Sequence, residues 1–232
     1  MNYNEVLRLL YQLANPEKVD FKRKKYGVIA HNSLGIYHSD LKSLAKQIGH
    51  QPKLALQLID SNIYEARLLA SKILKPKEIT EKQMNTWVNT FENWEVCDSY
   101  CMGLFSKTPY AVKQINSWAT RKPEFEKRAA FATLSSYCMA DKKASNEVFL
   151  SFLPLIKNAA TDDRVYVKKA VNWALRSIGK RNKDLNKIAL ASAQEIQKLN
   201  TKSSIWIAKG AIKELSGENV NILDYPRSIY RP

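Results

Sequence analysis

One kind of segment recurs along the chain, and this repetition limits the possible folds more than any other feature. Its copies combine small residues with a charged residue on an apolar helix, and they are EARLLASKIL (65–74), KRAAFATLSSY (127–137), KKAVNWALRSIG (168–179) and WIAKGAIKEL (206–215). A related segment, WEVCDSYCMGLF (94–105), fills the gap between the first two. Successive units therefore lie roughly 30 to 40 residues apart, the period of solenoids built from paired helices.

The composition and the positions of helix-breaking residues also favour helices. Seven Gly and eight Pro are few for an all-β chain, which needs a turn every ~8 to 12 residues. Frequent breaks, such as Asn15-Pro16 and Gln51-Pro52, predict many short helices, with Thr80 and Thr161 as expected helix starts. We predict an all-α, HEAT-like α-solenoid of stacked antiparallel helix pairs, forming a single domain over residues 1–232.

The charge balance points to a polyanionic partner. The chain has 37 Lys and Arg against 22 Asp and Glu, a formal charge of +15, and residues 164–232 are its most cationic part. Such an excess favours nucleic acid, with an anionic membrane surface as the rival partner. No apolar stretch is long enough to span a membrane. Three cysteines cannot all pair, so free thiols, a reducing compartment and a cytoplasmic location are expected.

Equivalent positions of successive copies suggest a shared groove. Asp98, Arg128 and Lys169 are such equivalents, and they become neighbours if the second helices of the units line one concave surface. Trp94 lies one helical turn before Asp98, and Trp173 lies one turn beyond Lys169. A carboxylate flanked by indoles in a basic groove suits a target that carries or develops positive charge. A solvated acid and two core tryptophans are the alternative interpretation.

Several other side chains have expected roles. Phosphate contacts in the groove are predicted for Arg128, Lys168, Lys169, Arg176, Lys180 and Arg181. Glu65 and Arg67 are expected in a mutual or interhelical ion pair. Cys97 and Cys101 are expected as buried apolar packing rather than metal ligands. Trp87, Trp118 and Trp206 are expected between helices. The tail 221–232 either docks on the last repeat or covers DNA.

Three separated motifs carry a family resemblance. They are NWEVCDSYC (93–101), EFEKRAAFATL (124–134) and YVKKAVNWALRSIGKRN (166–182), supported by NPEK (15–18) and LGI (34–36). With them, nearly the whole chain resembles the bacterial DNA alkylation repair glycosylases of the AlkD type, which are built from HEAT-like repeats. The resemblance implies a basic concave groove that binds duplex DNA.

The resemblance also implies the reaction and its residues. The family's catalytic carboxylate falls on Asp98, its lesion-contacting tryptophans on Trp94 and Trp173, its phosphate-gripping arginine on Arg128, and a tyrosine along the DNA backbone on Tyr26. The implied protein is a monofunctional DNA glycosylase that excises N3- or N7-alkylated purines without inserting the base into a pocket. It needs no metal or organic cofactor, and is expected as a monomer in the bacterial cytoplasm, nucleoid-associated when bound to DNA.

Two departures from the family pattern keep an alternative open. Asn93 stands where some members have a second tryptophan, and Tyr37 stands where a glutamine can occur. A HEAT-repeat scaffold that binds nucleic acid without catalysis is therefore the second hypothesis. A protein-binding HEAT scaffold is the third, but its concave face is expected to be acidic or apolar rather than basic.

Overall fold

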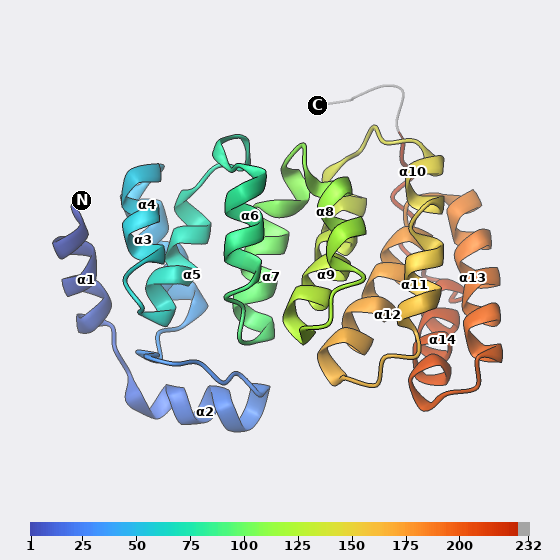
Figure 1. Cartoon of the computed structure of the whole chain (residues 1–232), viewed down its shortest axis with the longest axis horizontal. Coiled ribbons are helices and arrows are strands. Elements are labelled where there is room, and N and C mark those ends of the chain that lie inside the picture. Colours follow the sequence, from blue (N-terminus) through green and yellow to red (C-terminus); the bar gives the residue numbers. More distant parts are fainter. Residues whose placement is uncertain (227–232) are drawn as a thin grey trace. The chain divides into compact units, whose positions relative to one another are not determined.

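The structure of the protein is a computed structural model that describes residues 1–226. Over this range the chain is helical and contains no strand, which confirms the predicted all-α class (Figure 1). None of the described helices has both the length and the apolar character needed to cross a bilayer. The chain divides into two compact units between Thr108 and Pro109. The expectation of a single domain over residues 1–232 stays a prediction.

The first unit contains the N-terminal helices (Figure 1). In chain order they are α1 (Tyr3–Gln12), α2 (Pro16–Tyr26), α3 (His38–Ile48), α4 (Pro52–Ile59), α5 (Tyr64–Ile73), the 3-10 turn η1 (Pro76–Glu78), α6 (Glu81–Val88), α7 (Trp94–Gly103) and the 3-10 turn η2 (Phe105–Lys107). Helix α5 is the centre of the unit, because α3, α4 and α7 all pack against it. Thr80 caps α6 in a reciprocal bond with Gln83, which confirms that predicted start.

The second unit contains the longer helices. They are α8 (Ala111–Trp118), α9 (Glu124–Ala140), α10 (Asn146–Leu150), α11 (Leu153–Ala159), α12 (Val165–Gly179), α13 (Lys183–Lys198) and α14 (Lys202–Leu215). Helices α8 and α9, α11 and α12, and α13 and α14 pack as pairs, while α12 also contacts α9 and α14. The paired helices predicted from the repeats are therefore present in both units.

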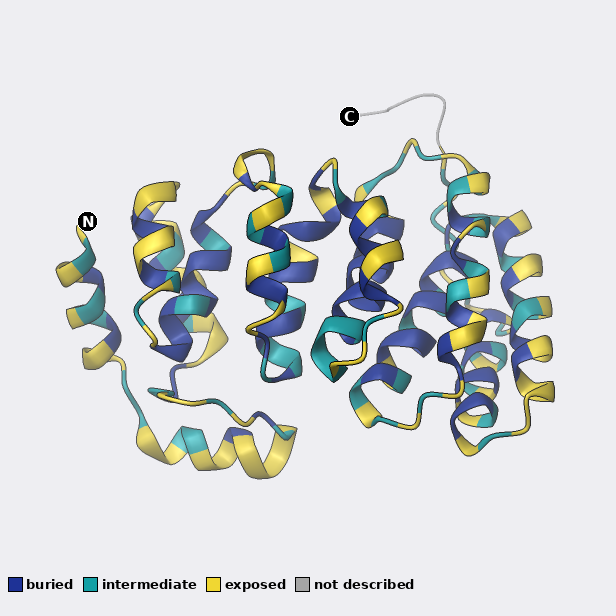
Figure 2. Cartoon of the chain, in the orientation of Figure 1, coloured by how far each residue is buried: buried dark blue, intermediate teal, exposed yellow. Residues whose placement is uncertain are grey.

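Each recurring segment forms the second helix of a pair. The copies at 65–74, 127–137, 168–179 and 206–215 lie in α5, α9, α12 and α14, and the related segment forms α7. Their alanines are buried, among them Ala66, Ala129 and Ala170, each at most 1% exposed. Figure 2 shows that these second helices are largely buried, whereas α2 is largely exposed. Small side chains let neighbouring helices approach closely.

A buried carboxylate organises the loop between α2 and α3. Glu65, fully buried on α5, accepts hydrogen bonds from the Ser33 hydroxyl and from the backbone N–H groups of Leu34 and Gly35 at 2.7–2.9 Å. Gly35 has a φ of +73°, and a Cβ there would lie 2.0 Å from the Asn15 carbonyl oxygen. The LGI and NPEK motifs thus meet at a close backbone contact that only glycine permits.

Three details differ from the sequence predictions. Thr161 does not start a helix, because α12 begins at Val165. Trp206 does not pack between helices; it is 45% exposed, whereas Trp118 is fully buried and Trp87 is 7% exposed. Glu65 pairs with no arginine and instead holds the α2–α3 loop. The interhelical pair expected for Arg67 is confirmed, with Glu92 at 3.0 Å. The expected burial of Cys97 and Cys101 is confirmed too.

The chain beyond α14 returns to the end of α12. The N–H of Leu223 donates to the Lys180 carbonyl at 2.8 Å, and the N–H of Tyr225 donates to the Arg181 carbonyl at 2.7 Å. The Asn182 side chain donates to the Tyr225 carbonyl at 2.5 Å. This part of the tail therefore docks on the turn between α12 and α13. Whether the tail covers DNA stays a prediction, and residues 227–232 lie outside the described residues.

Candidate active site

Helix α7 starts at a buried polar junction. The Asn93 side chain, 1% exposed, accepts hydrogen bonds from the N–H groups of Glu95 and Val96 and donates to the Ile29 carbonyl at 2.9 Å. The Tyr64 hydroxyl donates to the same Asn93 oxygen at 3.0 Å. Asn93 is therefore both the N-cap of α7 and its link to the α2–α3 loop. An indole at this position could not make these bonds, so the departure from the family pattern has a structural role.

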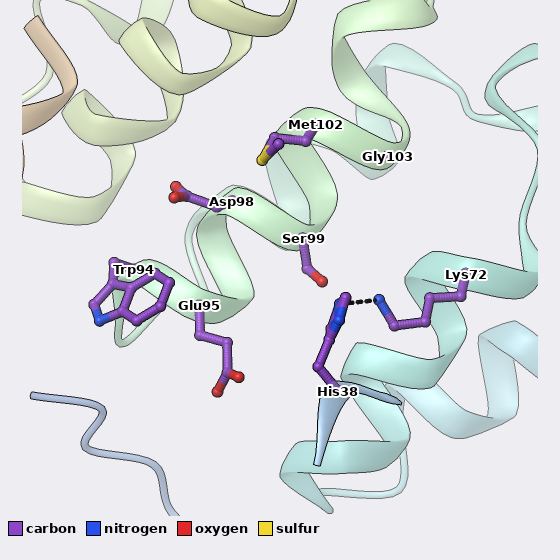
Figure 3. Close-up of a pocket in the computed structure, with 8 residues that line it drawn as sticks. All are labelled: His38, Lys72, Trp94, Glu95, Asp98, Ser99, Met102 and Gly103. Carbon is purple, nitrogen blue, oxygen red and sulfur yellow. Dashed lines mark hydrogen bonds between the residues drawn. The ribbon is translucent and has the colours of Figure 1, made fainter. Parts of the chain in front are cut away.

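One face of α7 opens into a cavity of about 500 Å³ (Figure 3). Helices α3, α5 and α7 supply its lining, which consists of His38, Lys72, Trp94, Glu95, Asp98, Ser99, Met102 and Gly103. Trp94, Asp98 and Met102 lie four residues apart, so they form one row along the helix. Among the described residues, no group of three or more His, Cys, Asp or Glu side chains is placed to hold a metal ion.

Trp94 is held in place by α2. Its indole Nε1–H donates to the Tyr26 carbonyl oxygen at 2.9 Å. The Tyr26 ring is 49% exposed and contacts the edge of Phe21 at 5.8 Å between centroids. The first unit thus brings together Trp94, Asp98 and Tyr26, three of the residues that the sequence assigned to the site. The bond to the Tyr26 carbonyl uses the one N–H group of the Trp94 indole.

The second carboxylate of the cavity is already engaged. Glu95 forms an ion pair with Lys22 at 2.7 Å and accepts a hydrogen bond from the Tyr64 hydroxyl at 2.9 Å. Burial, followed by the negative charge of Glu95, raises the pKa of Tyr64, which therefore stays a neutral donor. These contacts give Glu95 a structural role, and Asp98 is the other acid that lines the cavity.

The cavity also contains a His–Lys pair that sequence reasoning missed. Lys72 Nζ and His38 Nε2 lie 2.7 Å apart (Figure 3). Burial, and then the charge of Lys72, lowers the pKa of His38; burial likewise lowers the pKa of Lys72. The sequence does give one signal for Lys72, because a lysine stands within the apolar segment EARLLASKIL. Its partner was not recognisable, because 33 residues separate His38 from Lys72 and no motif links them.

The second unit holds the other predicted residues on α9 and α12. Lys169 is exposed, while Lys168 and Trp173 are half-buried. Lys168 Nζ lies 5.3 Å from the centroid of the Trp206 ring, a cation–π contact. Arg128 is only 6% exposed, and its Nη1 donates to the Tyr166 carbonyl at 2.8 Å. Their proximity to Asp98 in a shared basic groove stays a prediction.

Two predicted phosphate contacts are paired with an acid. Arg176 and Lys180 both form ion pairs with Glu214 of α14. Burial of the Glu214 carboxyl opposes ionisation, but hydrogen bonds from Lys180 and Arg176 outweigh it and lower the pKa of Glu214. The positive charge of these two residues is therefore offset locally, which charge counting along the sequence could not reveal.

The prediction that Arg181 contacts DNA is wrong. Arg181 is fully buried, and its guanidinium lies 3.8 Å from the centroid of the Phe149 ring. It donates to the carbonyl oxygens of Cys138, Asp141 and Ala144. A guanidinium used in this way joins the end of α12 to the α9–α10 loop and cannot reach a phosphate.

A basic surface that the sequence analysis passed over lies on α2. Arg23, Lys24 and Lys25 are consecutive and exposed, and Lys25 Nζ lies 5.1 Å from the Phe21 ring centroid and 5.6 Å from that of Tyr26. The run KRKK at 22–25 was a clear signal. Net charge alone does not single out this run, because the C-terminal third has the larger excess of Lys and Arg.

Comparison with known proteins identifies relatives of the chain. The family model described as DNA alkylation repair enzyme matches residues 6–215. Among solved structures, one described as a new family of proteins related to the HEAT-like repeat DNA glycosylases, with affinity for branched DNA structures, aligns with a TM-score of 0.75 and 19% identity over 99% of both chains. No curated protein sequence gives a significant match.

Two structures from Streptococcus mutans are also similar. AlkD2 aligns with a TM-score of 0.57 and 21% identity over 85% of this chain and 97% of its own. The smu.31 protein of strain UA159 has the same TM-score and identity over 91% and 98%. Likeness at these identities concerns the fold, and it confirms the predicted HEAT-like architecture.

Proposed function

The chain belongs to the family of DNA alkylation repair enzymes, and we propose from this premise that it is a DNA glycosylase which hydrolyses the N-glycosidic bond of N3- or N7-alkylated purines in duplex DNA. The observation that carries the proposal is the position of Asp98. It lines the first-unit cavity in one row with Trp94, whose indole is fixed by α2. The proposed site thus has two carboxylates on α7, of which Glu95 is bound to Lys22 and Tyr64 and Asp98 lies in the same row as Trp94.

The chemistry of the substrate explains why one carboxylate is enough. Alkylation at N3 or N7 gives the purine a positive charge, so it leaves without protonation by a general acid. The remaining task is to stabilise an oxocarbenium-like sugar and to orient a water molecule. In the proposal, the Asp98 carboxylate does both from beside C1′, because negative charge in a partly enclosed site stabilises a developing cation.

The tryptophans act through their ring faces. The Trp94 N–H already donates to Tyr26, which argues against a hydrogen bond from this indole to a lesion base. An electron-rich ring attracts the partly positive C–H groups of the sugar. Trp173 has the same proposed role on the lesion, and no insertion of the base into a pocket is required.

Duplex binding is assigned to exposed or half-buried cations. Lys168 and Lys169 stay the proposed phosphate contacts of the second unit, and Arg23, Lys24 and Lys25 extend the proposal to α2. Arg128 stays a proposed contact as well, although it is 6% exposed and bonded to the Tyr166 carbonyl, so it would reach a phosphate only by leaving that carbonyl. Each such contact releases condensed counterions, so affinity should fall steeply with salt. Arg176 and Lys180 contribute only when they leave Glu214.

The proposal is tested by base release from duplex DNA that contains 7-methylguanine. We expect Asp98→Asn to lower the single-turnover excision rate on the order of 100-fold or more, with little change in duplex affinity, since the lost charge acts mainly on the transition state. Asp60→Asn, which changes an exposed acid at the end of α4, is the matched control. Wild-type excision by the Asp98 variant would exclude Asp98 as the catalytic carboxylate.

A second candidate function is binding of branched DNA without catalysis. It is favoured by the likeness to the structure described as having affinity for branched DNA, which extends over 99% of both chains. Competition between a four-way junction and a linear duplex of equal length distinguishes the two functions. Preference for the junction together with no release of 7-methylguanine would favour the scaffold over the glycosylase.

A further inference from the structure

The His38–Lys72 pair lies in the wall of the cavity that contains Asp98, yet the hydrolysis proposed above uses neither residue. His38 is the first residue of α3, and Lys72 lies in the last turn of α5. Figure 3 shows the pair on the side of α7 that carries Glu95 and Ser99, whereas Asp98 points from the adjacent side of the same helix. An amine and a base therefore share a cavity with the proposed catalytic acid.

The surroundings of the pair favour an amine that loses its proton easily. Burial lowers the pKa of Lys72, the negative charge of Glu95 on α7 raises it, and the positive charge of Lys42 on α3 lowers it; the net direction is downward. Burial and then the positive charge of Lys72 lower the pKa of His38, Glu95 on α7 raises it, and Lys22 on α2 and Lys42 on α3 lower it; the net direction is downward, so the imidazole is neutral near pH 7. Its Nε2 lies 2.7 Å from Lys72 Nζ, close enough to exchange a proton with it. A lysine activated by desolvation and a neighbouring cation is the usual arrangement for attack on a carbonyl.

We propose that Lys72 is the nucleophile of an abasic-site lyase, forming a Schiff base with the C1′ aldehyde of a deoxyribose that has lost its base. The inference rests on the proposed function for the origin of this aldehyde, because excision leaves an abasic sugar in the same cavity. It adds a strand-cleaving step to the monofunctional reaction expected from the sequence.

The step balances without any further reactant. His38 Nε2 takes a proton from the Lys72 ammonium, and the free amine adds to C1′ of the open-chain sugar. The His38 imidazolium then returns this proton to the C1′ hydroxyl, which leaves as water and gives the protonated imine. Neutral His38 next removes a proton from C2′, the C3′–O bond breaks, and the 3′ phosphate leaves as a 5′-phosphorylated strand end. Hydrolysis of the conjugated imine returns Lys72 and releases the unsaturated aldehyde on the other strand end.

The size of the cavity is consistent with this transfer. About 500 Å³ lies within the range of small-ligand sites and exceeds what one deoxyribose needs. While closed, the sugar presents C1′ to Asp98. Once the ring opens, C1′ ends a freely rotating chain and can turn from the Asp98 side of α7 towards Lys72.

Borohydride trapping on an abasic duplex tests the inference directly. The duplex is prepared by enzymatic removal of uracil, so that no excision by this protein is needed, and sodium borohydride reduces the imine to a stable protein–DNA cross-link. We expect a cross-link whose modified peptide contains Lys72. Lys72→Arg, which keeps the charge but forms no imine, should abolish it, whereas Lys46→Arg, an exposed lysine of α3, should retain it.

The role of His38 is tested by the pH profile. We expect His38→Gln to slow trapping near pH 7 on the order of 100-fold, with recovery at higher pH, where solvent removes the Lys72 proton. A merely structural role would instead lower the yield equally at every pH. Equal slowing at every pH would overturn the assignment of His38 as the base.

The outcomes separate this inference from the proposed function. Peptide mapping of the wild-type cross-link to another amine, retention of the cross-link in Lys72→Arg, or no cross-link at all would each overturn the inference. None of these bears on release of 7-methylguanine, which is measured on a different substrate. A Lys72 cross-link in a protein that releases no base would support the lyase and contradict the glycosylase.

Discussion

Helices α7 and α12 come from related copies of one segment, yet they display their charged residues differently. In the first unit, α7 places Asp98 on a cavity wall, while its neighbour Asn93 is fixed by bonds to other parts of the chain. In the second unit, Arg176 and Lys180 at the end of α12 are paired with Glu214 on the adjacent α14. The helix that packs beside a repeat thus determines which of the charged residues of that repeat are neutralised within the protein.

The contrast between charges bound within the protein and charges exposed on its surface is tested most strongly at Arg181, which the sequence placed among the DNA contacts. Replacement of Arg181 by Met should lower the free energy of unfolding by on the order of 3 kcal/mol, because the buried carbonyl of Cys138 and the partly buried carbonyls of Asp141 and Ala144 lose their donor. Lys169→Met, at an exposed position, should change stability by less than about 0.5 kcal/mol and weaken DNA binding instead. Urea unfolding and duplex titration measure the two effects. A stable Arg181 variant with weakened binding would restore the original assignment.

A smaller loss is expected at Asn93 in the first unit. Asn93→Ala removes the N-cap of α7 and the donor to the Ile29 carbonyl, and should cost about 2 kcal/mol of stability. Asn93→Ser keeps a capping oxygen without adding a buried charge, but it is too short to reach Ile29, so it should lose less. Thermal unfolding of both variants tests the order. Equal losses would show that the link to Ile29, rather than the cap, holds α7.

The smallest effect on stability concerns Glu214, and its size depends on pH. Because the folded-state pKa of Glu214 is lowered, its ion pairs stabilise the fold above the unfolded pKa near 4.5, and this contribution disappears as the pH falls through the folded pKa. The side chains are about a third exposed, so the contribution should stay below about 1 kcal/mol. The stabilities of wild type and Glu214→Gln should therefore differ at pH 7 and converge as the pH falls through the folded-state pKa of Glu214, which lies below 4.5.

Glu214→Gln also tests whether Arg176 and Lys180 can bind DNA once their acidic partner is removed. Glu214→Gln releases Arg176 and Lys180 for phosphates, so the dependence of duplex affinity on salt should steepen by about one to two units. Binding isotherms between low and moderate salt measure this slope. An unchanged slope would place both cations away from DNA in the complex, whatever their pairing in the free protein.

The sequence predicted the helical class and the repeated pairs because small and apolar residues recur with a helical spacing that few other structures share. It also placed Trp94, Asp98 and Tyr26, which the first unit brings together. It failed at Arg181 and Trp206, where net charge and residue type were taken as guides to exposure. Burial of an arginine depends on carbonyl groups supplied by a distant loop, and periodicity carries no information about such a partner.

The return of the tail to α12 has a consequence for engineering this protein. The family match ends at residue 215, which makes that point an attractive place to shorten the chain or attach a fusion partner. Cutting there would remove the N–H groups of Leu223 and Tyr225 that bind the carbonyls of Lys180 and Arg181, and would leave the turn between α12 and α13 uncovered. Terminal repeats of solenoids need a cap to stay soluble. The shortest chain suitable for expression therefore ends no earlier than residue 226.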